Sequence, residues 1–291
     1  MPRRDFERTR ADFPAEWEPL ETEGMGGFVT RALHRRPDGS THLWTSRRHR
    51  KGRGGKVRSG GSEKAADPSH VRDNPWLGVW APGRISWWVA VGFMLGSALF
   101  ALGAGASLWF PAFMNTELVK RIADWSYFVG TTIFSVAVYL RLLETINADP
   151  HPGRARRRPD ENFRWFAWQP KRLSYVEVFI LLVGVSAKEG INWLLSVPSL
   201  LGAVLFVAGT YLQVAEVCHR YLCLKLRSIS WWSALFNFLG CIGFLVGAYA
   251  GLGVPGLSTP ADPSIVKAAY LQGSVFFLVG SYLMLPEMFS E

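Results

Sequence analysis

The chain has 291 residues, 49% of them hydrophobic, and a formal net charge of +9 at pH 7. It contains no HExxH, P-loop or nucleophile-elbow motif, which argues against the common hydrolases and nucleotide-binding enzymes. The spacing of Cys218, His219 and Cys223 fits no standard zinc pattern. We therefore predict no catalytic residue, no metal site and no cofactor.

Residues 1–84 form a polar and basic arm, and its polar start predicts no cleavable signal peptide. Residues 28–34 and 41–47 flank the turn sequence Pro37-Asp38-Gly39, which is compatible with a small β-hairpin. The run that follows, residues 47–58, is basic and Gly-rich and predicts a disordered linker.

Two roles stay open for this basic run. It either serves only to hold the N-terminus in the cytoplasm, or it also contacts anionic lipid head groups at the surface of the bilayer. Nucleic-acid binding would suit the charge, but no supporting fold accompanies it, so we expect none.

Six apolar segments of about twenty residues follow, each long enough to cross roughly 30 Å of hydrocarbon as a helix. Soluble helices would carry a charged outer face, which most of these segments lack. Trp and Tyr residues lie near their ends, as is typical of membrane interfaces. The predicted spans are residues 85–109, 125–145, 173–195, 198–217, 230–251 and 268–286.

The distribution of charge predicts the orientation of these spans. The arm, the loop after the second span and the loop after the fourth span hold 27 of the 32 Lys and Arg residues. By the positive-inside rule, both termini are expected in the cytoplasm. The predicted organisation is an arm (1–84), a first hairpin (85–146), a basic loop (147–172), a second hairpin (173–217), a short basic loop (218–229) and a third hairpin (230–291).

The hairpins repeat one another. Residues 85–104 and 229–248 are identical at ten of twenty positions, without a gap. Residues 130–144, 202–216 and 273–287 share the pattern Gly-x3-Phe-x4-Tyr-Leu-x3-Glu. We therefore predict an all-α membrane protein in which six helices form three parallel hairpin repeats around a pseudo-threefold axis.

A Gly-x3-Phe-x2-small pattern occurs in five of the six segments. On a helix these three positions lie on one face, where the glycine allows close approach of a neighbouring backbone. Packing is favoured over a ligand or pore function for this pattern. The predicted packing residues are Gly96, Gly130, Gly202, Gly240, Gly273, Phe100, Phe134, Phe206, Phe244 and Phe277.

Three acidic residues, Glu144, Glu216 and Glu287, end the second, fourth and sixth spans at the predicted cytoplasmic side. The simpler interpretation is that each is an interfacial carboxylate paired with Arg or solvated. The alternative is a ring of three acids that binds a cation or passes protons.

The third span breaks the repeat, because Lys188 stands where the others have Phe, with Glu189 beside it. If the register of the first repeat holds, Lys188 lies only about 5 Å outside the bilayer midplane, at 1.5 Å per residue. A charge at that depth marks a candidate ligand or ion site. If the span instead ends early near Gly184, Lys188 reaches the outer interface, and the two interpretations stay open.

The segments GAVLFVAGT at 202–210, GSVFFLVGS at 273–281 and, more loosely, GTTIFSVAV at 130–138 resemble the YrhK-like domain family of short bacterial two-span membrane modules. Residues 85–290 resemble three degenerate copies of that module. The resemblance implies a bacterial inner-membrane protein and transfers no catalytic residue. Lys188 departs from the family pattern and puts a purely structural second repeat in doubt.

The sequence thus favours a non-enzymatic binding, sensing or assembly component of the membrane. The alternative is a transporter or channel for an ion or small molecule that uses Lys188 and Glu189. A weaker alternative, an intramembrane lipid-modifying enzyme, has no supporting motif. Protein partners are not indicated.

Overall fold

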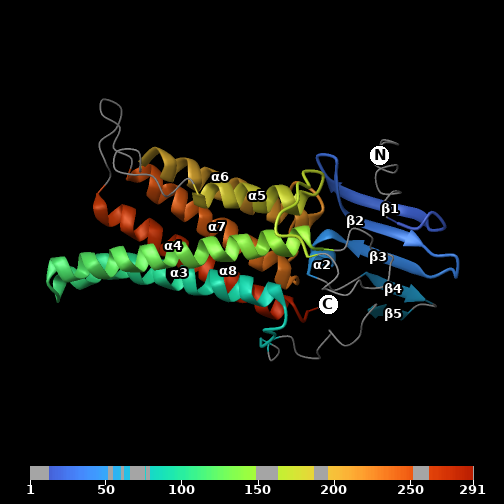
Figure 1. Cartoon of the computed structure of the whole chain (residues 1–291), viewed down its shortest axis with the longest axis horizontal. Coiled ribbons are helices and arrows are strands. Elements are labelled where there is room, and N and C mark those ends of the chain that lie inside the picture. Colours follow the sequence, from blue (N-terminus) through green and yellow to red (C-terminus); the bar gives the residue numbers. More distant parts are fainter. Residues whose placement is uncertain are drawn as a thin grey trace.

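The computed structural model describes residues 13–51, 55–59, 62–65, 76, 79–148, 163–186, 196–251 and 262–290. It consists of an elongated helical bundle with an antiparallel sheet at one end (Figure 1). The described chain begins beside the sheet, where the ring of Phe13 stacks on that of His34, and it ends at the end of the bundle that faces the sheet.

The sheet is a meander of five antiparallel strands in the order β1-β2-β3-β4-β5. Its turns fit their sequence, since Gly26, Gly27 and Gly39 have positive φ angles and the side chain of Asp38 accepts a hydrogen bond from the Ser40 amide at 2.9 Å. The strands are β1 (Glu18–Met25), β2 (Phe28–Arg35), β3 (Thr41–Thr45), β4 (Lys56–Ser59) and β5 (Ser62–Ala65).

The two strands expected from the sequence correspond to β2 and β3, which pair with His34 opposite His42. The basic run at 47–58, expected to be disordered, instead contains regular structure. A short helix, α2 (Ser46–Arg50), follows β3 directly, and β4 pairs with β3. Composition alone misled the prediction, because the side chains that hold this run in place come from distant helices.

The described bundle comprises six helices and one 3₁₀ turn. They are α3 (Ile85–Trp109), η3 (Phe110–Ala112), α4 (Thr116–Ile146), α5 (Leu173–Ser186), α6 (Ser196–Cys218), α7 (Ile229–Ala250) and α8 (Pro263–Glu287). Five of them, all except α5, are long and apolar enough to cross a membrane. The chain is therefore a multi-pass membrane protein. The third predicted span, 173–195, is described as a helix only from Leu173 to Ser186. A sixth membrane crossing therefore stays a prediction.

Two helices begin earlier than their hydropathy predicts. The side chain of Asn115 caps α4 by accepting the Glu117 amide at 2.8 Å, and Asp262 caps α8 by accepting the Ser264 amide at 2.7 Å. Each cap satisfies an otherwise unpaired amide, which extends each helix beyond the start of its predicted span.

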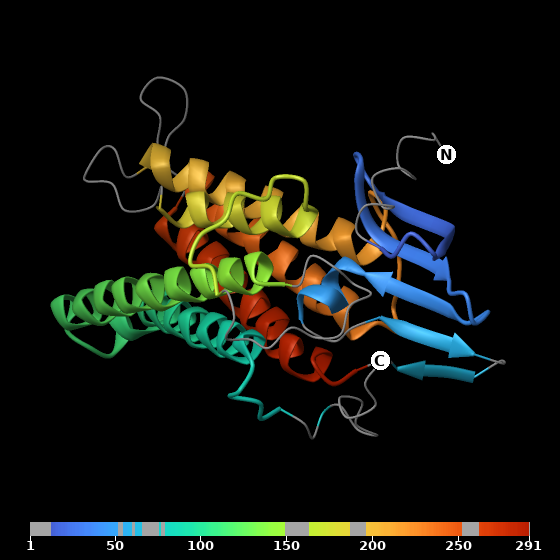
Figure 2. The same cartoon turned by 45° about the vertical axis from the view of Figure 1, so that its right-hand side comes forward.

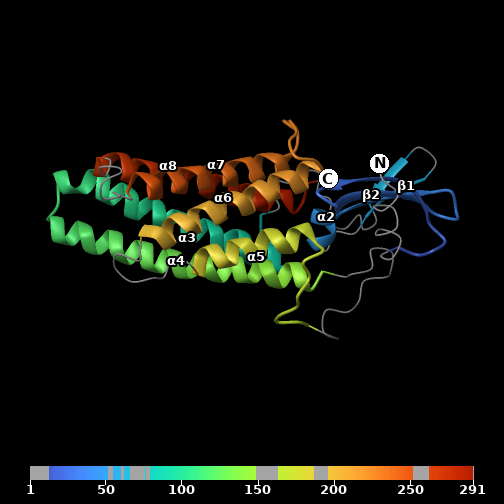
Figure 3. The same ribbon diagram turned by 90° about the horizontal axis from the view of Figure 1, so that it is seen from above.

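Consecutive helices are neighbours, and α8 returns to α3, which closes the bundle (Figure 3). The core on the bundle axis contains the repeated phenylalanines. The ring of Phe134 lies 5.7 Å from that of Phe206 and 5.0 Å from that of Phe277, measured between centroids. All three side chains are buried, so aromatic rings fill the middle of the bundle.

The repeated glycines mark close backbone contacts. A Cβ added to Gly96 would lie 3.1 Å from the carbonyl oxygen of Gly130, and one added to Gly240 would lie 2.8 Å from that of Gly273. Both helix pairs, α3–α4 and α7–α8, thus meet through glycine, as expected where lipid supplies no hydrophobic drive between helices. Gly202 is also buried.

Candidate functional site

The most unusual feature of the structure is a set of buried charges where the sheet meets the bundle. Helix α2 lies between the sheet and the ends of the bundle helices (Figure 2). Arg47, Arg50 and Lys51 are spaced i, i+3 and i+4, so they share one face of this turn. That face points at the three glutamates that end α4, α6 and α8. We call Arg47, Arg50, Lys51, Glu144, Glu216 and Glu287 the ionic cluster.

Glu287 holds two of the cations. Arg47 donates to it through both Nε, at 2.6 Å from Oε1, and Nη2, at 2.9 Å from Oε2. The Nζ of Lys51 lies 2.8 Å from the same Oε2. This bidentate geometry is the strongest that an arginine and a carboxylate form, and it fixes the direction of both side chains.

Arg50 lies between the other two glutamates. Its Nη2 is 3.1 Å from Oε2 of Glu216, and its Nη1 is 3.9 Å from Oε2 of Glu144. Arg47 also approaches Glu216, with 3.9 Å between Nη1 and Oε2. The three acids are therefore not three separate interfacial groups, because one cationic helix turn links them.

Each of the three glutamates also accepts a hydrogen bond from a serine hydroxyl. Ser86 at the start of α3 donates to Glu144, and Ser230 at the start of α7 donates to Glu287 at 2.9 Å. These two serines occupy the same position in the repeated sequence. The bond to Glu216 comes from Ser46 of α2, at 2.7 Å. We call the five strands and α2 the sheet module. It supplies to Glu216 the serine contact that the bundle itself supplies to Glu144 and Glu287.

A further ion pair, Arg141 to Glu177, lies within the bundle and joins α4 to α5. Together with the ionic cluster it brings four carboxylates and four cationic side chains together within the described residues. Each of the eight is at most 9% exposed. Burial of unpaired charge is costly, and the removal of one partner from such a set costs about 3–5 kcal/mol.

The environment shifts the pKa values of the basic residues. Burial alone would lower the pKa of Arg50, but Glu216, Glu177 and Glu144 outweigh it, and the pKa stands above its usual value. Burial lowers the pKa of Lys51 to about 8, although Glu287 acts in the opposite direction. The arginines therefore stay charged, whereas Lys51 is the cation of the cluster that titrates in mildly alkaline solution.

Apolar contacts support the same junction. Met25 of β1 and Phe28 of β2 pack against Leu173 and Ala215 at the ends of α5 and α6. Nearby, the hydroxyl of Thr30 lies 3.1 Å from Nδ1 of His219, the residue after α6. The sheet is thus attached to the bundle by hydrophobic contacts at one side and by the ionic cluster at the other.

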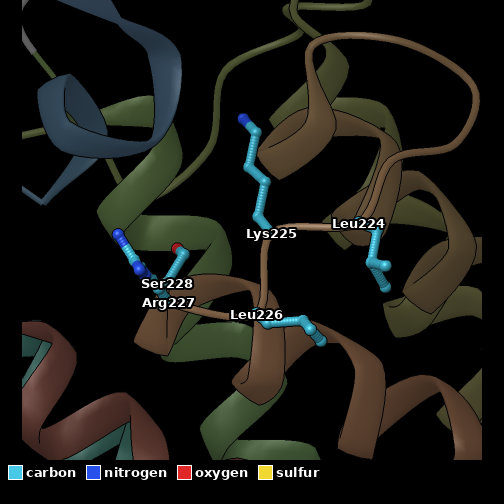
Figure 4. Close-up of a pocket in the computed structure, with 5 residues that line it drawn as sticks. All are labelled: Leu224, Lys225, Leu226, Arg227 and Ser228. Carbon is cyan, nitrogen blue, oxygen red and sulfur yellow. The ribbon is translucent and has the colours of Figure 1, made fainter.

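The segment between α6 and α7 is the second notable feature of this end. A disulfide joins Cys218 and Cys223 there, with their Cα atoms 5.4 Å apart, whereas reduced thiols would be usual at a cytoplasmic surface. Figure 4 shows the shallow surface hollow beside it, lined by Leu224, Lys225, Leu226, Arg227 and Ser228.

The structure brings Glu144, Glu216 and Glu287 together, as the ring interpretation requires, but fills the space between them with the chain's own cations. Lys188 and Glu189 lie outside the described residues, so their role stays a prediction. Sequence reasoning missed Arg47, Arg50 and Lys51. Their i, i+3, i+4 spacing was the available signal, but they were assigned to a disordered linker.

Among the described residues, no group of three or more His, Cys, Asp or Glu is placed to hold a metal ion. Comparison with protein-family models, with curated proteins and with solved structures finds no match for the chain.

Proposed function

We propose that this protein is a non-enzymatic assembly or sensing component of the bacterial inner membrane, in which a six-span bundle holds a cytoplasmic β-sheet module in a fixed position. The module faces the cytoplasm in this proposal because the positively charged loops lie at its end of the bundle. The resemblance of the repeats to the YrhK-like domain family is in keeping with it.

One observation supports this proposal most strongly: three cationic side chains of the sheet module are buried among three glutamates of three different helices. Buried charge pairs contribute little net stability, but they define one geometry and penalise every other. An arrangement of this kind suits a protein whose task is to present one domain at one orientation. It also gives the module and the bundle a means of sensing each other.

The part of the bundle axis that the structure describes favours a component that does not conduct ions over a channel. Phe134, Phe206 and Phe277 fill it at one level, and ten residues further along each helix the ionic cluster fills it at the sheet end. An ion that entered the bundle from the sheet side would have to displace Arg47 and Arg50. The transporter alternative therefore rests on Lys188 and Glu189 alone.

Two measurements on the full chain test the proposal. In proteoliposomes, a pH-sensitive or potassium-sensitive dye should report no flux above that of empty vesicles, and protein-dependent flux would contradict an assembly role. In cells that lack the gene, the double variant Arg47→Met with Glu287→Met removes the bidentate pair and, with it, the contact of Lys51 with Glu287. It should insert normally but fail to complement the deletion, whereas the surface pair variant Arg35→Met with Glu18→Met should complement it. Equal complementation by both would count against the proposal.

A further inference from the structure

The connection between α6 and α7, residues 219–228, stands out from the side of the bundle at the end next to the sheet (Figure 3). Its side chains alternate. Leu222, Leu224 and Leu226 are 74%, 73% and 57% exposed, whereas Cys223 and Lys225 are half-buried. Figure 4 shows Leu224 and Leu226 turned away from Arg227. The segment therefore presents a row of leucines on one side and basic groups on the other.

This row is held rigidly rather than free to fold back on the protein. Three of its carbonyl oxygens accept hydrogen bonds from aromatic side chains of α6 and α7. The three bonds are Tyr211 Oη to Tyr221 at 3.2 Å, Trp231 Nε1 to Cys223 at 3.0 Å and Trp232 Nε1 to Leu226 at 2.8 Å. Because these hydrogen bonds hold the backbone in place, the leucine side chains stay at the surface.

Because the segment joins the ends of two helices that are long and apolar enough to cross a membrane, we expect it at the depth of the lipid head groups. Trp231 and Trp232, at the start of α7, are the residue type that is enriched at that depth. The basic residues Arg220 and Arg227 flank the leucines and are exposed, and the Nζ of Lys225 caps the Val217 carbonyl at 2.7 Å. The position matches the chemistry of the interface, where acyl chains and phosphates meet.

We infer that residues 220–227 form a binding surface for anionic phospholipid. The leucine row enters the outer part of the acyl region, and the guanidinium groups of Arg220 and Arg227 contact the phosphate of one or two adjacent head groups. Arginine suits this task because its planar fork donates two hydrogen bonds to a phosphate. Lys225 is already bonded to the backbone and shapes the segment.

A bilayer explains the surface better than water or a second protein does. In water, the exposure of three neighbouring leucines is unfavourable in free energy, whereas the acyl chains of a bilayer would bury them. The charge on the flanks complements a negative head group directly. The inference depends on the placement of the helices in the membrane and not on the proposed assembly role.

Native mass spectrometry of the purified full chain, titrated with phosphatidylglycerol or phosphatidylcholine, tests the inference. The variant Arg220→Gln with Arg227→Gln should bind phosphatidylglycerol about tenfold more weakly and phosphatidylcholine unchanged. The matched control is Lys120→Gln with Arg121→Gln, which removes the same charge at the far end of the bundle and should bind phosphatidylglycerol like the wild type. Equal weakening in both variants, or in neither, would overturn the inference.

A second variant tests the leucines. Leu222→Ser, Leu224→Ser and Leu226→Ser together should reduce the number of bound copies of both lipids, because the acyl contact does not depend on the head group. If this variant instead converts an oligomer to a monomer while its lipid binding stays at the wild-type level, the row binds a protein copy and the lipid assignment is wrong.

Discussion

Replacement of Glu216 by Gln is the most informative single change, because it removes one charge from the centre of the ionic cluster and keeps the side chain's size. Glu216 accepts hydrogen bonds from Ser46 at 2.7 Å and from Arg50 at 3.1 Å, and it is fully buried. In the variant, Arg50 keeps its charge but loses its closest carboxylate, and only the weaker effects of Glu177 and of Glu144, at 3.9 Å, remain. We expect a loss of about 3–5 kcal/mol, the range for a buried ion left without its partner.

The loss should appear in thermal unfolding of the detergent-solubilised protein. For a chain of this size each kcal/mol shifts Tm by roughly 2–4 °C, so a decrease of about 10 °C is expected. Glu18→Gln is the matched control, because Glu18 forms an exposed pair with Arg35 at 2.9 Å. Such pairs contribute about 0–1 kcal/mol, so its Tm should stay within about 3 °C of the wild type.

A double variant distinguishes the electrostatic cause from a general loss of packing. Arg50→Met added to Glu216→Gln removes the uncompensated cation, so part of the lost Tm should return. If Glu216→Gln behaves like the surface control, or if Arg50→Met lowers Tm further by the amount it costs alone, the charges of the cluster are not coupled and the reasoning fails.

Three other predictions concern packing and pH. Gly240→Ala should lower Tm by several degrees, since the new Cβ would lie 2.8 Å from a backbone oxygen. Gly83→Ala is the control and should leave Tm unchanged, because nothing lies within 4 Å of its Cβ. Equal effects of the two changes would argue against the glycine contact. The pKa of Lys51 is lowered from 10.5 to about 8 by burial, so the unfolded chain binds more protons between these values, and stability should rise with pH from about 8 to 10.5. Lys51→Met should remove that rise, and a wild-type rise that persists in this variant would show another origin. Burial likewise lowers the pKa of His42 from 6.5 to about 4, so its contribution should be lost as pH falls from 6.5 to 4. His42→Gln should reduce the slope of Tm against pH in that window, and the remaining slope should come in part from His34 and His219, whose pKa values burial also lowers.

The membrane helices were predictable because hydropathy is a local property. The positions of α3, α6 and α7 follow their apolar segments closely. The start of α4 at Thr116 was missed because its first turns are polar, and only the capping residue Asn115 marks it in the sequence. The β-hairpin at 28–47 was found through its turn sequence, but β1, β4 and β5 carry weaker alternation and were not predicted.

Of the candidate site, only the residues that the bundle contributes were predictable from the sequence. Repetition singled out Glu144, Glu216 and Glu287, because the same acid recurs ten residues after the same Phe. Their partners lie far away in the chain, and Arg47 and Glu287 are 240 positions apart. Composition places Arg47 in a solvated Gly-rich run, and no local pattern states which distant carboxylates neutralise it.

The coupling between Arg47 and Glu287 tests the central claim most directly, because this pair joins the sheet module to the membrane bundle. It is obtained from the unfolding free energies of the wild type, Arg47→Met, Glu287→Met and the double variant in one detergent. The account predicts a coupling energy of at least about 2 kcal/mol, since each single variant leaves one buried charge without its bidentate partner. The contact between Lys51 and Glu287 is lost in both Glu287→Met and the double variant, so it cancels from the coupling energy. A coupling energy near zero would mean that the sheet does not bind the bundle through these residues, and it would contradict the account.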